Sequence, residues 1–499
     1  MDSSEEYAQR FPHLQFTRWT TGAMASQAGF GCYRINTHNV HHEQALHRAL
    51  TSGINVIDTS ANYGDGSAEE LIGKVLADVQ THSGITREEL IVVSKAGYMQ
   101  GRNYHRAHKR EHLGNAFPHV VKFGEGLWHC IHPEFLEDQI TRSIRHMNTP
   151  YVDVYLLHNP EYFLIHAQRE EIPLEEARAE FYYRIKLAFE HLEKEVASGR
   201  IKHYGISSNC FAHPAHADDF VSLERCLEIA EEVAGANHRF KVAQLPFNLL
   251  ETNAATELNQ NGNTQTFLEY AQEHDITVMV NRVLNAITQN SLIRLAEHAF
   301  AGTPAPTESD IAALIGDCVK HEDDMLQRIL PTLPFEEHSK ETLADFLSPG
   351  LHLVHHWDKF ESVEHWHDVQ MQYLQPRMNE AIEAILHHPV EGMDDWIAAF
   401  KLVTKDAFKA ITHFYAVKAQ PRLTLIREKA VSVFGEKFND MTIAQLAFNA
   451  PRATVGVHCT LIGARREQYV DEVIQSLQSP MPALTREHWE QLAGLEQVV

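Results

Sequence analysis

Four polar residues in the first third of the chain have the types that proton transfer requires. Asp58 closes the apolar run INVID, and Tyr63 follows it by five residues. Lys95 closes the run IVVSK, and His158 closes VYLLH. If these runs are neighbouring strands of a barrel, their carboxyl ends share one rim. We therefore expect the four side chains to lie together.

Lys95 constrains this arrangement most strongly. A lysine at the end of a buried strand needs a carboxylate partner, because an unpaired buried charge costs several kcal/mol. Asp58 on the neighbouring strand can supply that partner. The pair is expected to place the ammonium near the Tyr63 phenol, lowering the pKa of the phenol and making it a usable proton donor.

The elements that would position these residues alternate along the chain. Near-continuous apolar runs, expected as strands, occupy 28–33, 54–58, 90–95, 152–158, 203–209, 241–248, 276–281 and 458–463. Amphipathic stretches between them include 133–148, 180–198, 218–235 and 264–273. Another helix is expected to begin near Ser67, with a capping box formed by Ser67 and Glu70.

This alternation is typical of a parallel sheet covered by helices, and eight strand–helix units predict a closed (β/α)8 barrel, the TIM barrel of the α/β class. Residues 16–27 are expected to form an N-terminal β-hairpin turned at Thr21 and Gly22, which would plug the barrel floor. No G-x-G-x-x-G motif follows a strand, which argues against a Rossmann domain.

A large insertion separates the seventh expected strand from the eighth. Residues 286–440 contain helical patterns, among them 291–300, 309–330, 375–388 and 394–417, and lack convincing strands. We predict barrel strands 1–7 with the hairpin in 1–285, a helical insertion in 286–440, and the last strand with C-terminal helices in 441–499. A structureless loop of this length would be improbable in a compact protein.

The composition narrows the possible partners and the compartment. The 499 residues carry 43 Lys and Arg against 67 Asp and Glu, a formal net charge of -24. An acidic protein binds nucleic acid or anionic membranes poorly because the charges repel, so neither is expected as a partner. The six scattered cysteines form no C-x-x-C pair, and no apolar run reaches membrane-spanning length. We expect a soluble, cytoplasmic protein.

Several longer motifs carry a resemblance to a known family. GFGCY, NVIDTSANYGDGSAEELIGKVL, IVVSKAG, VDVYLLHNP, GRIKHYGISSN, VAQLPFNLLE and LIGARREQYVDEV occur in this order through 16–285 and 441–478. They resemble the motifs of the aldo-keto reductase family. The resemblance implies an oxidoreductase that interconverts a small-molecule carbonyl (aldehyde, ketone or sugar) and an alcohol by hydride transfer.

The resemblance also implies roles for the four polar residues. Tyr63 would be the general acid, Lys95 and Asp58 the pair that tunes it, and His158 the donor that positions the substrate carbonyl. Taken singly, an Asp or Lys at a strand end is usually structural. The spacing of all four together favours catalysis.

The cofactor implied by the resemblance is NADP(H). Ser208, Asn209 and Gln244 match the residues that hold the nicotinamide carboxamide, and Gly463 lies at the end of the last strand. Arg465 and Arg466 stand at a helix start, where a phosphate is favoured and arginine can grip it with paired hydrogen bonds, so they would bind the 2′-phosphate.

Three features depart from the family pattern. Asn281 stands where many members have an aromatic residue, and the next residue, Arg282, is a candidate contact for the cofactor diphosphate. The long basic loop 98–135 is expected to overhang the substrate site. The third departure is the insertion, whose histidine-rich stretch 352–368 is expected to be an ordinary helix face, so we predict no metal site.

The insertion leaves two functional interpretations open. It is expected to form a lid that covers the catalytic rim and restricts which carbonyl compounds enter. Alternatively, the barrel binds a nucleotide as a sensor or assembly subunit, and the insertion is a partner surface. The presence of Tyr63, Lys95, Asp58 and His158 favours the enzyme, because a binding module has no need of a general acid. Substrate and oligomeric state stay open.

Overall fold

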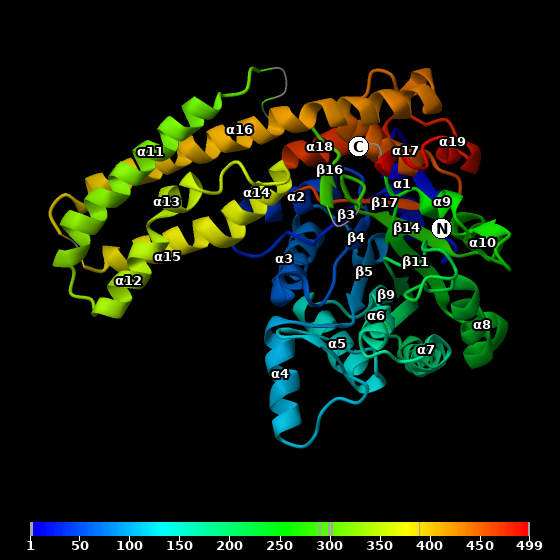
Figure 1. The fold of residues 1–499 in the computed structure, drawn as a ribbon. Coiled ribbons are helices and arrows are strands. Elements are labelled where there is room, and N and C mark those ends of the chain that lie inside the picture. Colours follow the sequence, from blue (N-terminus) through cyan, green and yellow to red (C-terminus); the bar gives the residue numbers. More distant parts are fainter. Residues whose placement is uncertain (1–2, 289–290, 298–299, 301–302, 389, 498–499) are drawn as a thin grey trace. The chain divides into compact units, whose positions relative to one another are not determined.

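The computed structural model describes residues 3–288, 291–297, 300, 303–388 and 390–497 (Figure 1). By internal packing the chain divides into two units. The first, here called the barrel unit, combines Met1–Ala286 with Lys429–Val498, and the second, the helical unit, is Ile287–Glu428. No helix among the described residues is both long and apolar enough to cross a membrane.

The barrel unit contains a closed barrel of parallel strands, as the sequence predicts. Around the barrel the strands follow one another in chain order. They are β3 (Ala28–Gly31), β4 (Val56–Asp58), β5 (Ile91–Ala96), β9 (Val152–His158), β10 (Ile201–Ser207), β11 (Phe240–Pro246), β14 (Thr277–Asn281) and β17 (Cys459–Ile462). Each expected run contains or overlaps its strand, so the (β/α)8 prediction is confirmed.

The expected hairpin is also present and caps the barrel interior. Strands β1 (Phe16–Arg18) and β2 (Met24–Ser26) pair antiparallel. Trp19, in the turn between them, is 1% exposed and packs in one cluster with inward strand residues such as Val154, Val242 and Met279. The Trp19 indole therefore closes the end of the barrel that the hairpin was expected to plug.

Helices follow most of the barrel strands, as Figure 1 shows. Those that alternate with the strands are α2 (Val40–Thr51), α3 (Ser67–His82), α5 (Pro133–His146), α7 (Leu174–Ala197), α8 (Leu223–Ala234), α10 (Phe267–Glu273), α17 (Ile443–Ala453) and α18 (Glu467–Leu477). Further short elements are α1 (Ser3–Arg10), α6 (Tyr162–Arg169), α9 (Asn253–Thr256), β12 (Leu258–Gln260), β13 (Gln265–Thr266) and α19 (Arg486–Glu490).

The start of α3 differs from the expected capping box. Gly66, in the left-handed region with φ 95°, is the N-cap, and Ser67 is already helical. The Ser67 hydroxyl donates to the Gly64 carbonyl at 2.8 Å. The prediction of a capping box is wrong because the turn through Gly64 and Gly66 brings the chain directly into the helix.

The segment 98–135 is ordered rather than a plain loop. It contains α4 (Gly101–His112) and an antiparallel sheet of β6 (Tyr98–Met99), β8 (Leu127–His129) and β7 (Val121–Gly124). Three arginines of α4 form ion pairs with carboxylates, at 3.1 Å (Arg102), 2.7 Å (Arg106) and 3.0 Å (Arg110). Much of the positive charge of α4 is therefore balanced within the barrel unit.

The helical unit is mostly helical, with one exception to the sequence prediction. It comprises α11 (Glu308–Asp324), α12 (Glu337–Phe346), α13 (Pro349–Val354), α14 (Val363–Asp368), α15 (Gln375–Leu386) and most of α16 (Met393–Phe434). Residues 291–300, expected as a helix, instead begin with β16 (Ser291–Arg294), which pairs with β15 (Asn285–Thr288). The periodicity of a short apolar run does not distinguish a strand from a helix.

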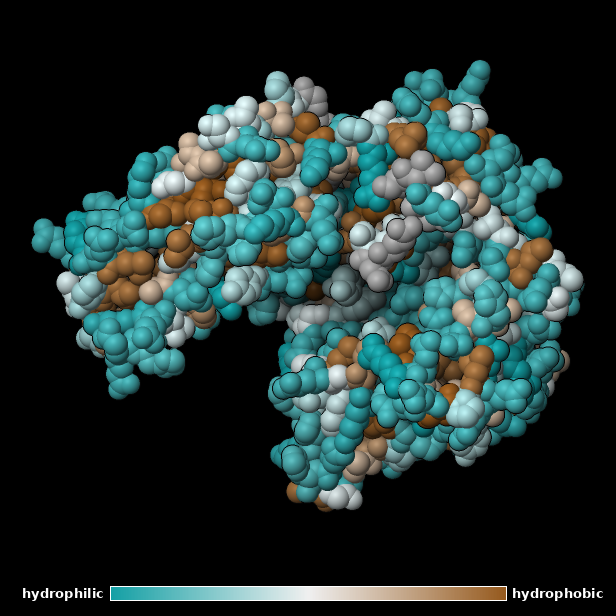
Figure 2. Space-filling view, in the orientation of Figure 1, coloured by the Kyte–Doolittle hydropathy of each residue, from teal (hydrophilic) through white to brown (hydrophobic). Residues whose placement is uncertain are grey.

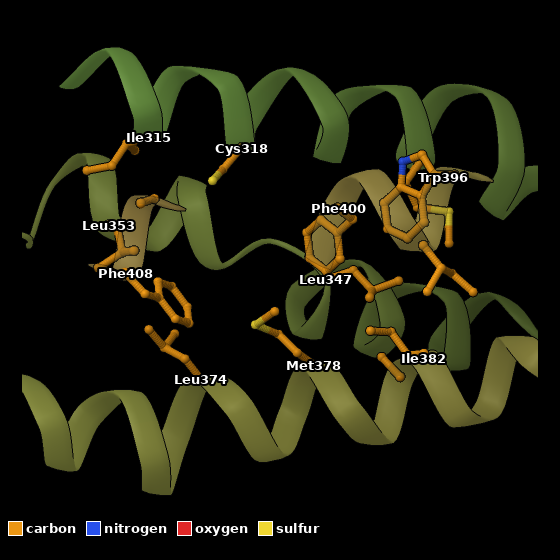
Figure 3. Packing of buried hydrophobic residues seen from close by; sticks show 14 of the residues in the cluster. Ile315, Cys318, Leu347, Leu353, Leu374, Met378, Ile382, Trp396, Phe400 and Phe408 are labelled. Carbon is orange, nitrogen blue, oxygen red and sulfur yellow. The ribbon is translucent and has the colours of Figure 1, made fainter. Parts of the chain in front are cut away.

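The helical unit has a hydrophobic core of its own. Figure 3 shows side chains of α11, α15 and α16 pointing toward one another, among them Cys318, Met378 and Phe400. Trp366 of α14 is fully buried, and its indole N–H donates to Thr412 Oγ1 at 2.8 Å. Apolar patches nevertheless remain on the surface of this unit (Figure 2).

A buried carboxyl group links two elements of the helical unit. Glu322 of α11 is 2% exposed, and its oxygens accept the N–H groups of Gly350 (2.6 Å) and Leu351 (3.0 Å) in the first turn of α13. Burial raises the pKa of Glu322 from 4.5 to about 7, although the two backbone hydrogen bonds oppose that shift.

We predict that Glu322 makes the stability of the helical unit depend on pH. A carboxyl group with a raised folded-state pKa binds more protons when folded, so its contribution falls as pH rises from about 4.5 to about 7 and is constant above. Glu322→Gln cannot ionise, and its stability relative to wild type should rise over that window by on the order of 3 kcal/mol. Thermal unfolding from pH 4.5 to 8 measures the difference, with exposed Glu308→Gln on the same helix as control. A pH-independent difference would contradict this account.

Candidate active site

The strand register brings the predicted residues to one rim. Asp58, the last residue of β4, is opposite Val93 of β5, and Lys95 lies two residues further along β5. His158 ends β9 and is opposite Ser207, the last residue of β10. Since all strands of the barrel are parallel, these residues share the carboxyl-terminal rim. Active sites of (β/α)8 barrels are built at this end.

Lys95 and Asp58 form the predicted buried ion pair. Lys95 is fully buried and Asp58 is 4% exposed. Lys95 Nζ donates to Asp58 Oδ2 at 2.8 Å and to the Thr59 carbonyl at 2.9 Å. The second carboxylate oxygen, Oδ1, accepts a hydrogen bond from Gln244 Nε2 at 2.8 Å. The charges of the pair are therefore matched, and two ammonium N–H groups and both carboxylate oxygens have hydrogen-bond partners.

Tyr63 lies next to this pair, in the turn Tyr63–Gly66 after β4. Lys95 Nζ is 5.1 Å from the centre of its ring. Burial of the phenol, together with the negative charge of Asp58, raises the pKa of Tyr63 well above its ordinary value. The pKa of Tyr63 is therefore shifted in the direction opposite to the expected lowering, because burial and the Asp58 charge dominate. The phenol keeps its proton at neutral pH and can donate it.

His158 faces Tyr63 from the neighbouring part of the rim. The two ring centres are 5.9 Å apart. Burial, with Lys95 and His129 nearby, lowers the pKa of His158 well below its ordinary value, so the imidazole is neutral. Its Nδ1 is 3.0 Å from the Ser60 hydroxyl.

Ser60 and His129 are contributors that the sequence reasoning missed. Besides contacting His158, the Ser60 hydroxyl lies 2.7 Å from Asn62 Oδ1 and 3.1 Å from the Lys95 carbonyl. His129 Nε2 donates to the His158 carbonyl at 2.8 Å, and burial lowers the pKa of His129 to about 4. Ser60 falls inside the motif DTSANY, which could have pointed to it, whereas His129 lies in the segment expected as a loop.

The residues expected at the nicotinamide carboxamide lie beyond β10 and on β11. Ser208 is buried, whereas Asn209 is exposed. Gln244 Oε1 accepts from Ser207 Oγ (3.1 Å) and Asn281 Nδ2 (3.2 Å), in addition to the bond that Gln244 gives to Asp58. The Gln244 amide is therefore largely engaged within the chain.

A buried carboxyl group, also missed, holds the segment that carries Ser208 and Asn209. Glu161 is 1% exposed, and its Oε1 accepts the Asn209 backbone N–H at 2.8 Å. Burial raises the pKa of Glu161 to about 7. The positions of Ser208 and Asn209 thus depend on a residue that follows β9.

The two remaining groups of candidate cofactor residues lie apart in the sequence. Arg282 follows β14, has a left-handed backbone (φ 56°) and pairs with Glu251 Oε1 at 2.9 Å. Gly463 follows β17, and the exposed residues Arg465 and Arg466 precede α18, with Arg466 as its N-cap. These positions agree with a helix start, where the backbone N–H groups favour an anion.

Comparison with known proteins agrees with the resemblance found in the sequence. The model of the Aldo/keto reductase family matches residues 28–291, more than half of the chain. The chain belongs to the aldo/keto reductase family.

Individual relatives are distant. The NAD(P)H-dependent D-xylose reductase of Scheffersomyces stipitis is 23% identical over 192 residues, which are 36% of this chain and 48% of that protein. The uncharacterized oxidoreductase YqkF of Bacillus subtilis is 26% identical over 183 residues, 37% and 45% of the two chains. The chain thus spans about half the length of these curated relatives.

The similarity to solved structures is also distant. The aldo-keto reductase AKR11C1 of Bacillus halodurans is 16% identical, with 97% of each chain covered and a TM-score of 0.47. An aldo/keto reductase of Klebsiella pneumoniae, solved in complex with NADP and acetate, is 16% identical, with 96% of this chain and 94% of that chain covered and a TM-score of 0.41.

We predict that Asp58→Asn destabilises the barrel unit by about 3–5 kcal/mol, because the fully buried Lys95 ammonium loses its counter-charge. The double variant Asp58→Asn with Lys95→Met removes both charges and should recover much of that loss. Urea unfolding followed by circular dichroism measures both. A single variant as stable as wild type, or a double variant that is less stable than the single one, would show that the ion pair is not the controlling interaction.

Proposed function

We propose that this protein is an NADP(H)-dependent oxidoreductase that interconverts a carbonyl compound and an alcohol. The observation that carries the proposal is the contact geometry of the rim, where a protonated phenol lies beside a buried Lys–Asp pair and a neutral imidazole. Lys95 Nζ is 2.8 Å from Asp58 and 5.1 Å from the Tyr63 ring. Membership of the aldo/keto reductase family supports the same function.

The residues of the chain supply proton transfer and orientation. Tyr63 gives its phenolic proton to the carbonyl oxygen during reduction and accepts a proton from the alcohol during oxidation. The neutral His158 ring carries one N–H. In the tautomer that carries this N–H on Nε2, the ring can hold the substrate oxygen.

The chain also offers groups that fit a nicotinamide dinucleotide. The amide oxygen of Asn281 is buried without a hydrogen-bond partner among the described residues, and it lies beside Gln244 at the same rim. Ser208 and Asn209 would hold the carboxamide, Arg282 with Gly463 would line the diphosphate path, and Arg465 with Arg466 would hold the 2′-phosphate. When bound, the dinucleotide supplies or takes up the hydride.

NADPH absorbance followed over a panel of aldehydes, ketones and sugars tests this proposal directly. Oxidation of NADPH that depends on a carbonyl compound is expected for at least one class. The alternative is a nucleotide sensor or assembly subunit with the helical unit as a partner surface. That surface does expose large apolar residues, namely Leu351, Val354, Met371, Leu386 and Leu402. Tight NADPH binding without turnover of any panel member would favour this alternative.

We predict that Tyr63→Phe lowers turnover by about 10²–10⁴-fold, because it removes the positioned general acid while keeping the ring. NADPH affinity, measured by fluorescence titration, should be nearly unchanged. Tyr183→Phe, which alters an exposed tyrosine of α7, is the matched control and should behave as wild type. Wild-type turnover in Tyr63→Phe would show that another group donates the proton.

We predict that Arg465→Ala with Arg466→Ala weakens NADPH binding by about 1.5–3 kcal/mol for each charge-assisted hydrogen bond that the substitutions remove. NADH has no 2′-phosphate, so its affinity should scarcely change and serves as the internal control. Fluorescence titration of both cofactors against both proteins gives the four affinities. Equally weakened binding of NADPH and NADH would place the two arginines away from the 2′-phosphate.

A further inference from the structure

The segment that follows β10 brings together three side chains that commonly bind metals. Cys210, His213 and Asp219 each offer one ligand atom, and these atoms all lie within 4.8 Å of one another. His213 Nδ1 is 2.9 Å from Asp219 Oδ1, and Cys210 Sγ is 3.4 Å from Asp219 Oδ2. Two ligands held at about 2.0–2.3 Å by one tetrahedral ion lie about 3.3–3.7 Å apart. The Cys210–Asp219 distance is already in this range, and His213 and Asp219 would need to separate by about half an ångström.

The backbone that carries these side chains is held from outside the segment. Asn259 Nδ2 donates to the carbonyls of Phe211 (2.9 Å) and His213 (2.8 Å). Arg178 donates to the carbonyls of Ala215 (3.0 Å) and Ala217 (2.8 Å). The backbone that carries the three ligands is therefore already fixed by other parts of the barrel unit. Little conformational entropy of this segment would be lost when an ion binds.

Exposure and charge around the cluster also suit a bound cation. Cys210 is 4% exposed, whereas the side chains of His213 and Asp219 are 41% and 28% exposed, so the cluster is open to solvent on one side and closed behind the sulfur. The buried carboxyl group of Glu161 interacts electrostatically with both Cys210 and His213. Arg282, a cationic side chain that also interacts electrostatically with Cys210 and His213, is itself paired with Glu251.

We propose that Cys210, His213 and Asp219 bind one Zn²⁺ ion. Binding displaces the thiol proton of Cys210 and the proton between His213 Nδ1 and Asp219, so that a thiolate, a neutral imidazole and a carboxylate face the dication. Three protein ligands leave the fourth tetrahedral position to water. The spacing C-x2-H-x5-D matches none of the common paired-cysteine patterns of zinc sites, which is why the sequence gives no expectation of a metal there.

The site is independent of the proposed catalytic chemistry but adjoins it in the chain. Cys210 directly follows Ser208 and Asn209, and its backbone N–H donates to Ser208 Oγ at 3.0 Å. A bound ion would restrain the backbone at Cys210, next to Ser208 and Asn209, which are proposed to bind the nicotinamide carboxamide.

Cobalt titration of the full-length, chelator-treated protein tests the proposal, because Co²⁺ replaces Zn²⁺ and reports its ligands by absorbance. We expect one equivalent of Co²⁺ to produce a thiolate-to-cobalt charge-transfer band and visible bands of four-coordinate cobalt, both removed by one equivalent of Zn²⁺. Cys210→Ser should abolish the charge-transfer band. His213→Ala and Asp219→Asn should weaken affinity by more than the about 10–100-fold that loss of an outer hydrogen-bond partner of a ligand costs.

The same part of the chain offers a matched control for each ligand. Cys226→Ser changes another buried cysteine, and His216→Ala and Asp218→Asn change exposed residues of the same segment. All three controls should bind Co²⁺ as wild type does, and circular dichroism verifies the fold of each variant. The proposal is overturned if wild type shows no charge-transfer band, or if the band survives in Cys210→Ser. Should Cys210→Ser fail to fold, an undiminished cobalt affinity in Asp219→Asn overturns it equally.

Discussion

The ion pair between Lys95 and Asp58 is the interaction around which the rim is arranged. A fully buried ammonium is stable only where its charge and its N–H groups are matched, and Asp58 with the Thr59 carbonyl provides both. Thr59 directly follows β4, so Lys95 at the end of β5 holds the end of the neighbouring strand β4 in place. The turn that carries Tyr63 begins only a few residues later, and its position therefore follows from the same ion pair.

One hydrogen bond extends this constraint across the barrel. In the strand order, β4 and β11 are second and sixth of eight and therefore lie opposite one another. Gln244 on β11 donates to Asp58 on β4 at 2.8 Å, and it accepts from Ser207 of β10 and Asn281 of β14. Side chains from alternate strands of such barrels meet in layers, which explains how two opposite strands can touch. With Lys95 of β5, which also bonds to Asp58, five strands share one side-chain network.

The fold was readable from the sequence because each strand is a compact apolar run and each interval is a helix or a turn. The ends of those runs also located Asp58, Lys95 and His158, since parallel strands must end at one rim. The partners of these residues could not be predicted in the same way. The contacts of Gln244 with Asp58, of Ser60 with His158 and of Glu161 with Asn209 join segments far apart in the chain, and no local pattern marks them. The wrong prediction at Ser67 had a local cause. Ser67 and Glu70 have the spacing of a capping box, but the glycine turn before them makes Gly66 the N-cap and Ser67 the first helical residue.

The protonation states at the rim decide what kind of reaction it suits. Burial and Asp58 keep the proton on Tyr63, while burial and the Lys95 charge keep His158 neutral. The full charges of the site, on Lys95 and Asp58, neutralise each other in a buried ion pair. What faces an incoming molecule is a pair of neutral groups, one of which holds a proton tightly until a stronger base is formed beside it. In the proposed reduction, a carbonyl oxygen would become such a base only as its carbon is reduced, so the proton would move late, with the developing negative charge. Burial, which raises the pKa of Tyr63, is thus compatible with its proposed role as a donor, since it suppresses ionisation of the phenol in the resting site.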